Sequence, residues 1–317
     1  MAQPALTFSG WQVATAVDNL EAMGVSPQDI ILLWTKHDDN LVKKIESVYH
    51  TQNYVFPDNR PHLAVQYIPS VRPYLWWQFL SKYPEFQNED FVYQDSDVIY
   101  RKIPNLNTMN KLSATHWYGG DTESYTGPDY MNSKGKDFIH RTANFLGITD
   151  EQFWSFKGSS VGAHWVISHP RASYWQDVFN GSYKLYAWVK NVEHEYDYVL
   201  QKNGGDQQYW FQVWVAEMIA EAYLCAKYGI TTEKSPELAF SWSSDTIDRY
   251  SKFNILHNSG VTKDVALKNN LFFKGDYQQQ SPFSRDMMHF NPDYCSSEYA
   301  KRVAYTAQRL QSEGIHI

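Results

Sequence analysis

The spacing of apolar residues over the first hundred positions constrains the fold more than any other feature of this sequence. Residues 11–24 carry apolar side chains at helical spacing and end at Gly24, a residue that suits a helix C-cap. The next apolar run, IILLW at 30–34, is continuous, which is typical of a strand buried on both faces of a parallel sheet. Residues 39–50 return to helical spacing. We therefore predict a helix, a strand and a second helix in this order.

The same alternation continues as far as residue 104. HLAVQYI at 62–68 predicts a strand, and the helix that follows has Pro73 at an early position and stops before Pro84. DFVYQDSDVIY at 90–100 begins as a strand and then breaks into polar residues. Strands and helices that alternate at this spacing indicate βαβ units with right-handed crossovers. We therefore predict an α/β fold with a mostly parallel sheet flanked by helices.

The pattern loosens after residue 104. Residues 105–135 are rich in Asn, Ser, Thr, Gly and Tyr and predict a long loop with some short strands. The other predicted elements are helices at 136–149, 174–200 and 211–229, a strand at 161–167, and the short apolar segments ELAFSW, FNILHNSG and LFFKGDY. No repeat and no change in composition marks a linker, so the sequence predicts one domain over residues 1–317.

The composition is that of a globular protein with an excess of aromatic residues. Hydrophobic residues make up 43% of the 317 positions, which is ample for a core. Aromatic residues make up 16%, and such side chains either hold planar ligands and sugar faces or fill a core. We assign Trp210 and Trp214 to the core.

The net charge and the two cysteines narrow the class of protein and of partner further. The net charge is −7 and no basic run is present, which counts against a polyanion as partner without deciding the question. No signal-peptide pattern and no apolar run of ~20 residues is present, so we predict a soluble, cytoplasmic protein with no membrane partner. Cys225 and Cys295 fit no metal or redox spacing, and Cys225 is expected to pack as a small hydrophobe.

The sharpest local motif is QDSDVIY. Its two carboxylates, Asp95 and Asp97, follow the strand-like FVY, and open α/β sheets bind their ligands at the carboxyl ends of strands. Mn²⁺ and Mg²⁺ prefer such oxygen ligands and complete their shell with water and phosphate oxygens. An Asp-x-Asp pair is also common by chance, and the alternative is a solvated turn after a strand.

A histidine far along the chain is a candidate third ligand. His257 comes directly after an apolar strand in NILHNSGV and is followed by Asn258, Ser259 and Gly260, which predict a tight turn. Its imidazole nitrogen suits the same metal. The alternative is a histidine whose hydrogen bonds are satisfied at a strand edge.

In this order the two motifs resemble GT-A glycosyltransferases, which have an Asp-x-Asp pair after an early strand and often a metal-binding histidine near the C-terminus. The blocks YIPSVRPYLWWQFL, QDSDVIYRKIPNL and VWVAEMIAEAYLCAKYG resemble hydroxyproline O-arabinosyltransferases and peptidyl-serine galactosyltransferases. The resemblance implies a GT-A-type, Rossmann-like sheet. It implies a nucleotide-binding half at 1–104, and at 105–317 an acceptor half with a C-terminal segment that binds the metal and the diphosphate. It implies that Asp95, Asp97 and His257 bind Mn²⁺ or Mg²⁺ and that the donor is a nucleoside diphosphate sugar, with a UDP-sugar preferred.

A closer resemblance is to glycosyltransferase-like proteins of tailed phages and viral metagenomes. It rests on KDFIHRTANFLGI, SSVGAHWVI, FQVWVAEMIAEAYLCAKYGI, PELAFSW, ILHNSGV and LFFKGDY, which lie between residues 136 and 277. Those proteins usually have Gly-Gly-Ala-Gln where this chain has Val161, Gly162, Ala163 and His164. The resemblance implies an acceptor in phage DNA, the 5-hydroxymethyl group of a modified pyrimidine such as 5-hydroxymethylcytosine, and hence the cytoplasm of a bacterial host.

Two carboxylates are predicted to be catalytic, Glu217 and Asp206. Glu217 lies among apolar residues of a predicted helix, where a carboxylate is costly unless it is paired or functional. By the resemblance it lies on the acceptor side, to orient the hydroxyl or to act as a base. The alternative is a helix residue paired with a nearby Lys or Arg. The arabinosyltransferase resemblance implies retention, in which the leaving diphosphate itself commonly takes the acceptor proton.

Four further residues are predicted to bind substrate. Lys274, between a strand and a glycine, is suited to meet the diphosphate, and Arg72 begins a helix close to the predicted nucleotide end of the sheet. Trp242 and Asp245 in SWSSD resemble residues that line the donor sugar. For Arg72 and Lys274 the alternative is a surface charge.

Three functions remain open on the sequence alone. The first is sugar transfer to a hydroxymethylpyrimidine in DNA, which requires flipping of the base. The second is the same chemistry on a protein or glycan acceptor, which the acidic pI favours slightly. The third is a nucleotide- or carbohydrate-binding protein without turnover. No P-loop or dinucleotide fingerprint and no Gly-x-Ser-x-Gly elbow is present in the sequence.

Overall fold

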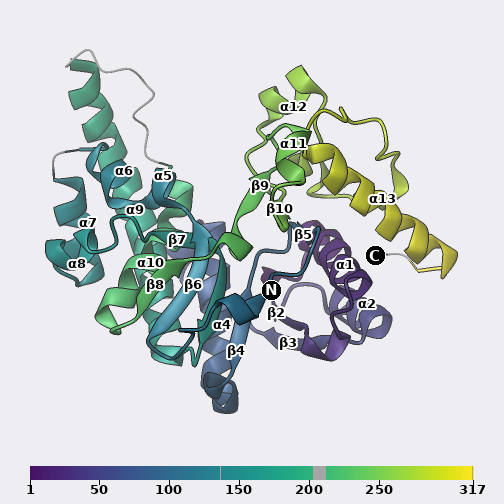
Figure 1. Ribbon diagram of the computed structural model, residues 1–317, viewed down its shortest axis with the longest axis horizontal. Helices are drawn as coiled ribbons and strands as arrows, with labels where there is room; N and C mark the ends of the chain where they lie inside the picture. Colours follow the sequence, from purple (N-terminus) through teal and green to yellow (C-terminus); the bar gives the residue numbers. More distant parts are fainter. Residues whose placement is uncertain (136, 203–211, 316) are drawn as a thin grey trace. The chain divides into compact units, whose positions relative to one another are not determined.

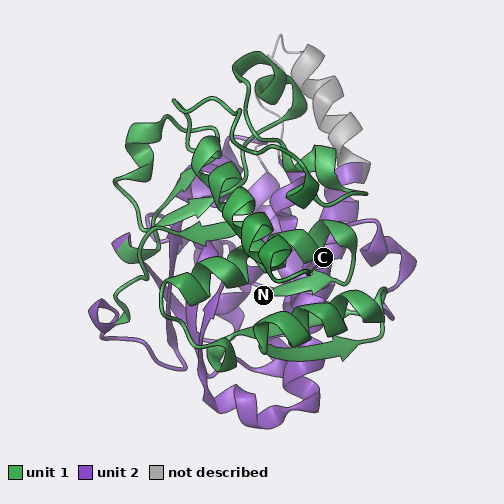
Figure 2. Cartoon of the chain, turned by 90° about the vertical axis from the view of Figure 1, so that its right-hand side faces the viewer, with its two compact units in different colours: residues 1–57, 94–106, 237–317 green, residues 58–93, 107–236 purple. Residues whose placement is uncertain are grey.

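A computed structural model describes residues 1–135, 137–202, 212–315 and 317. The chain divides into two compact units that are interleaved in sequence (Figure 2). Unit 1 comprises residues 1–57, 94–106 and 237–317, and unit 2 comprises residues 58–93 and 107–236. The prediction of a single domain with halves that meet at residues 104 and 105 stays a prediction.

Unit 1 begins with the predicted βαβ pattern. Its three parallel strands lie in the order β1-β2-β3 and are joined by two helices (Figure 1). The elements are β1 (Ala2–Pro4), α1 (Thr7–Ala22), β2 (Ile31–Thr35), α2 (Asp39–Tyr49) and β3 (Gln52–Phe56). Asp38 caps α2 by accepting hydrogen bonds from the backbone N–H groups of Asn40 and Leu41, at 2.9 and 3.2 Å.

A second sheet of unit 1 joins segments that are distant in sequence. Its strands lie in the order β5-β10-β9, antiparallel between β5 and β10 and parallel between β10 and β9. They are β5 (Val98–Tyr100), β9 (Phe240–Trp242) and β10 (Ile255–His257). The remaining helices of the unit are α11 (Ile247–Tyr250), α12 (Lys263–Asn269) and α13 (Ser296–Ser312).

Helices α1 and α13 bury the core of unit 1. Large side chains from both helices and from the strands meet there without exposure to solvent, among them Trp11, Trp34, Leu256, Phe272, Tyr299 and Val303. The core also encloses a charged group, since Asp18 of α1 forms ion pairs with Arg302 and Arg309 of α13. Thr306 donates a further hydrogen bond to Asp18 at 2.9 Å.

A side-chain amide of α1 takes the place of a neighbouring strand beside β5. Asn19 Nδ2 donates to the carbonyl oxygen of Tyr100 at 3.0 Å, and Asn19 Oδ1 accepts from the N–H of Tyr100 at 2.6 Å. Both residues are buried, so these two backbone groups depend on Asn19. The amide thereby fixes the strand that directly follows Asp95 and Asp97.

Replacing Asn19 by leucine is expected to lower the free energy of unfolding by about 2–3 kcal/mol, because two buried backbone groups lose their partner. Chemical denaturation followed by circular dichroism measures the change. The matched control is Asn40→Leu on the exposed surface of α2, for which we expect a change within about 0.5 kcal/mol. Equal stabilities of the two variants would contradict the role assigned to Asn19.

Unit 2 is built on a four-stranded mixed sheet in the order β4-β7-β6-β8. Strands β4/β7 and β6/β7 are antiparallel, whereas β6/β8 are parallel. The strands are β4 (Asp90–Tyr93), β6 (His116–Asp121), β7 (Val161–Ser168) and β8 (Thr231–Lys234). All eight residues of β7 are buried. Ala163 of this strand has a φ of 60°, and the register shifts between Gly119 and Gly120 on the opposite strand.

The longest described helix of unit 2 is α9 (Ala172–Lys202), and α10 (Ala216–Lys227) carries Glu217. The others are α3 (His62–Val65), α4 (Val71–Lys82), α5 (Glu123–Thr126), α6 (Pro128–Asn132), α7 (Phe138–Leu146) and α8 (Asp150–Trp154). Cys225 of α10 is buried as predicted, and burial raises the pKa of its thiol to about 12. None of the helices in the described ranges is long and apolar enough to cross a membrane.

The α/β class is confirmed, and three local predictions are wrong. One of them is the long loop at 105–135, because α5 and α6 lie within that range. Among the described residues four strand ladders are parallel and three antiparallel, distributed over three small sheets. HLAVQYI does not form a strand, because α3 begins after Pro61, and short apolar runs do not distinguish the two structures. Trp214 is not a core residue, since it is 57% exposed. Trp210 lies outside the described residues.

Candidate metal centre

The pairing of β5 with β10 brings Asp97 beside His257. Val98, the first residue of β5, lies opposite His257, the last residue of β10. Asp97 immediately precedes β5, and its carbonyl oxygen accepts a hydrogen bond from the backbone N–H of Asn258 at 2.8 Å. The ladder therefore extends by one pair beyond the strands and fixes the backbone at both candidate ligands.

Three predicted ligands converge in unit 1. His257 Nε2 lies 3.6 Å from Asp95 Oδ2 and 3.4 Å from Asp97 Oδ1. One ligand atom from each of the three residues lies within 4.8 Å of the other two. The side chains are 15%, 6% and 9% exposed for Asp95, Asp97 and His257. The site is thus recessed, with Asp95 the most accessible of the three.

This donor set fits a divalent metal. Two carboxylates and an imidazole suit Mn²⁺, and bonds of roughly 2.1 Å allow two ligands of one ion to lie up to about 4.2 Å apart. The distances from His257 to both carboxylates are within that limit. Two acidic groups that are held this close and are largely withdrawn from water also require a cation for compensation. The residues present therefore fit the ion that the sequence predicts.

Lys274 supplies one such positive charge. Its ammonium forms an ion pair and hydrogen bond with Asp97 Oδ2, and its side chain is 32% exposed. Burial alone would raise the pKa of Asp97, but Lys274 and His257 outweigh it and hold that pKa well below its usual range. Asp97 is thus ionised at neutral pH. The structure places Lys274 at the acidic pair, and its contact with a diphosphate stays a prediction.

Trp242 and Asp245 support the histidine. The indole ring stacks on the His257 imidazole with ring centroids 5.7 Å apart and planes inclined by 19°. Asp245 accepts a hydrogen bond from the backbone N–H of Trp242 at 2.9 Å. Gly260 has a φ of +80°, and a Cβ there would approach Ser244 Oγ to 2.9 Å. The ring of Trp242 orients His257, and Asp245 holds the backbone of Trp242. The predicted contact of Trp242 and Asp245 with the donor sugar stays a prediction.

Two polar residues that support the turn after His257 are not among the predicted site residues. Ser243 Oγ donates a hydrogen bond to Asn258 Oδ1 at 2.7 Å, and both side chains are buried. Because β9 and β10 are parallel, the residues that follow each strand meet at the same edge of the sheet. The available sequence signal is the polar residue that directly follows each of two short apolar segments.

The other predicted site residues belong to unit 2. Glu217 is 1% exposed and forms an ion pair with Arg72 at 2.5 Å. Tyr93 donates a hydrogen bond to Glu217 Oε1 at 3.2 Å, and the Glu217 N–H donates to Tyr67 Oη at 2.8 Å. The structure therefore brings Arg72 and Glu217 together. Glu217 is a helix residue paired with an arginine, which is the alternative that the sequence left open. A catalytic role of Glu217 stays a prediction, and Asp206 lies outside the described residues.

Comparisons with known proteins give distant structural likenesses alone. No protein-family profile matches the chain, and no curated protein matches its sequence. Among solved structures, the apo form of the bifunctional glycosyltransferase WbbM matches 98% of this chain and 50% of its own, with a TM-score of 0.47 and 9% identity. The chain spans about half the length of that glycosyltransferase. The candidate site rests on its own geometry.

Proposed function

We propose that this protein is a metal-dependent glycosyltransferase of the GT-A type that moves a sugar from a nucleoside diphosphate sugar to a hydroxyl. One observation carries the proposal, the convergence of Asp95, Asp97 and His257 at the ends of the paired strands β5 and β10. Two carboxylates and an imidazole at the carboxyl end of β10 form a site that would hold Mn²⁺ or Mg²⁺ against a diphosphate.

The chain's own residues define what the site does in this proposal. Asp95 and Asp97 provide oxygen ligands and His257 a nitrogen ligand, with Trp242 fixing the imidazole plane. A bound divalent cation would stabilise the charge that develops on the departing diphosphate. Lys274 is close enough to add a second positive charge at the same leaving group. These roles need no base on the protein, in keeping with the retention that the sequence resemblance implies.

The acceptor is proposed on the sequence resemblance alone. We infer a 5-hydroxymethylpyrimidine in phage DNA as acceptor and a UDP-sugar as donor, in the cytoplasm of a bacterial host. The acidic composition, with a net charge of −7, favours the alternative of a protein or glycan acceptor. A protein that binds sugar nucleotides without turnover is the third possibility. The three differ in the product that is formed and are separated by one assay.

Incubation with Mn²⁺, a panel of nucleoside diphosphate sugars and hydroxymethylcytosine DNA is expected to give glycosylated DNA, detected by mass spectrometry. Parallel reactions contain unmodified DNA, a peptide or a glycan as acceptor. Transfer to peptide or glycan alone selects the alternative acceptor. Binding of a sugar nucleotide without hydrolysis or transfer, equal for the wild type and Asp95→Ala, would refute the enzyme.

A further inference from the structure

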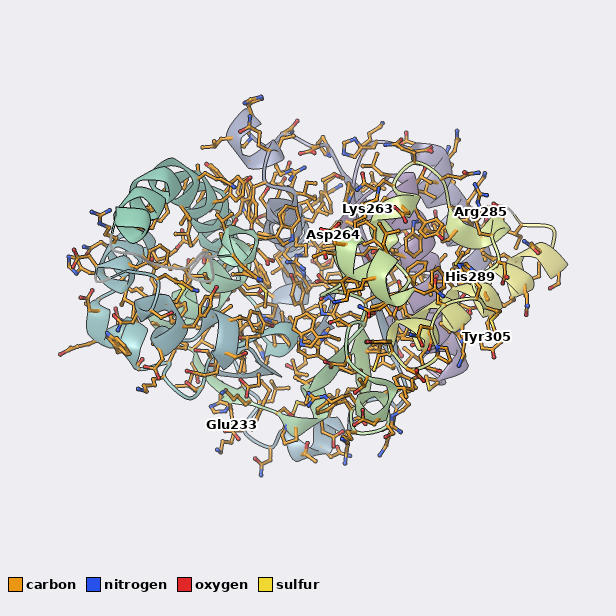
Figure 3. The ribbon with its side chains drawn as sticks, turned by 90° about the horizontal axis from the view of Figure 1, so that it is seen from above. Glu233, Lys263, Asp264, Arg285, His289 and Tyr305 are labelled. Atoms are coloured by element: carbon orange, nitrogen blue, oxygen red, sulfur yellow. The ribbon has the colours of Figure 1, made fainter. Side chains whose placement is uncertain are left out.

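Lys274 lies beside Asp97, where its side chain limits how a metal ion can bind to that carboxylate. It begins the short 3₁₀ helix η8 (Lys274–Tyr277), and its ammonium contacts Asp97 Oδ2, whereas Asp97 Oδ1 faces His257. Lys263 and Asp264, which begin α12, are instead exposed (Figure 3). Lys274 therefore places a positive charge directly against Asp97 in the free protein.

An ammonium and a divalent cation at one carboxylate oppose each other. Like charges within about 4–6 Å disfavour one another, and the effect is strongest where water is largely excluded, as at Asp97. The ammonium of Lys274 offsets the negative charge of Asp97. A divalent cation at the same carboxylate adds two positive charges beside that ammonium. The diphosphate of a sugar nucleotide carries two negative charges, so the charge that the metal adds is balanced when the diphosphate is bound too.

We propose that Lys274 blocks the metal centre in the free protein and moves from Asp97 to the diphosphate when metal and donor bind together. The inference rests on the proposed function and adds a coupling to it. Metal binds weakly without a diphosphate because it must displace or tolerate the ammonium. Metal and diphosphate together bind tightly because the ammonium gains a new partner. By linkage, each ligand raises the affinity for the other by the same factor.

The test measures Mn²⁺ binding directly, by electron paramagnetic resonance of free Mn²⁺ in titrations of the apo protein with Mn²⁺ alone. We expect Lys274→Met to bind Mn²⁺ about tenfold more tightly than the wild type, the equivalent of ~1.4 kcal/mol. Lys274→Arg retains the positive charge and is expected to stay close to the wild type. Thermal denaturation of each variant establishes that it is folded.

Lys252→Met is the matched control, since Lys252 belongs to the same unit and forms an exposed ion pair with Asp248. It removes the same charge from the protein and is expected to leave the Mn²⁺ affinity within about twofold. A second titration contains UDP. We expect UDP to tighten Mn²⁺ binding to the wild type by a larger factor than to Lys274→Met, because only the wild type transfers an ammonium to the diphosphate.

The outcomes separate this inference from the proposed function. If Lys274→Met binds Mn²⁺ no more tightly than the wild type, while Asp97→Asn abolishes binding, the blocking role is refuted and the metal centre stands. If neither the wild type nor Lys274→Met binds Mn²⁺, with or without UDP, the metal centre and the blocking role both fail. Tighter binding by Lys274→Met and by Lys252→Met alike would indicate a general effect of net charge and would also overturn the blocking role.

Discussion

Replacing Asp97 by asparagine is expected to lower the rate of sugar transfer about a thousandfold and to abolish Mn²⁺ binding to the free protein. The Asp97 carboxylate is almost fully buried between His257 and Lys274, so we expect no other side chain to replace it as an oxygen ligand of the metal. Charge stabilisation by a bound metal contributes several kcal/mol to such reactions, and ~4 kcal/mol corresponds to three powers of ten in rate. Steady-state kinetics with the sugar nucleotide found in the panel gives the rate.

The control for this variant is Asp248→Asn, which neutralises an exposed carboxylate in the same unit. Asp248 forms an ion pair with Lys252 and accepts a hydrogen bond from Thr246. Its kinetics and Mn²⁺ affinity are expected to equal those of the wild type. A second check is that the Asp97→Asn variant is folded. We expect it to be folded because asparagine keeps the shape of the side chain. Wild-type transfer by a folded Asp97→Asn variant would show that the reaction does not run through this site.

Replacing Asp18 by asparagine is expected to lower the free energy of unfolding by about 3 kcal/mol. The carboxylate is buried on α1 and accepts from Arg302 at 2.6 Å and from Thr306 at 2.9 Å, with Arg309 on its other oxygen. Removing one partner of a buried ion pair typically costs about 3–5 kcal/mol, because the remaining charges are left without compensation. We expect the lower end of this range, since Arg302 and Arg309 keep part of their contact with water.

Denaturant titration followed by circular dichroism checks this value, with Asp29→Asn as the control. Asp29 lies on an exposed turn of the same unit, so its neutralisation is expected to change the stability by less than about 0.5 kcal/mol. The double variant Asp18→Asn with Arg309→Met is expected to recover part of the loss, because it removes one of the unbalanced charges. A loss below about 1 kcal/mol for Asp18→Asn would mean that the arginines find other partners.

The residues of the candidate metal centre could be singled out in the sequence because each lies in a short local pattern. Asp95 and Asp97 follow an apolar run and His257 ends another, so their chemistry shows in the sequence. The ladder between β5 and β10 that joins them was not predictable. Each strand has three residues, which is too short for a period-2 pattern to stand out from chance. Asn19 gave no signal either, since a single polar residue on a helix does not reveal its hydrogen-bond partner.

Elements with a strong apolar pattern were predicted, and an element with a weak apolar pattern was missed. The continuous apolar run at β2 and the helix α10 were predicted in place, as their large apolar side chains repeat at the right spacing. We predicted no element after residue 277, although α13 covers α1. The face that α13 buries includes small residues such as Ser296, Ala300 and Ala307, which contribute little to an apolar pattern. Helices that pack through small residues are therefore easily missed.

The interleaving of the two units also sets when the site can form during synthesis. Asp97 leaves the ribosome ~160 residues before His257, and at a rate of 5–20 residues per second this interval lasts roughly 10 to 30 s. The rest of unit 2 leaves the ribosome during that time, whereas β9 and β10 of unit 1 follow only near its end and α13 follows later. The nascent chain therefore carries two aspartates without the histidine or the lysine. The candidate metal centre is therefore complete only late in translation, after most of the chain has had time to fold.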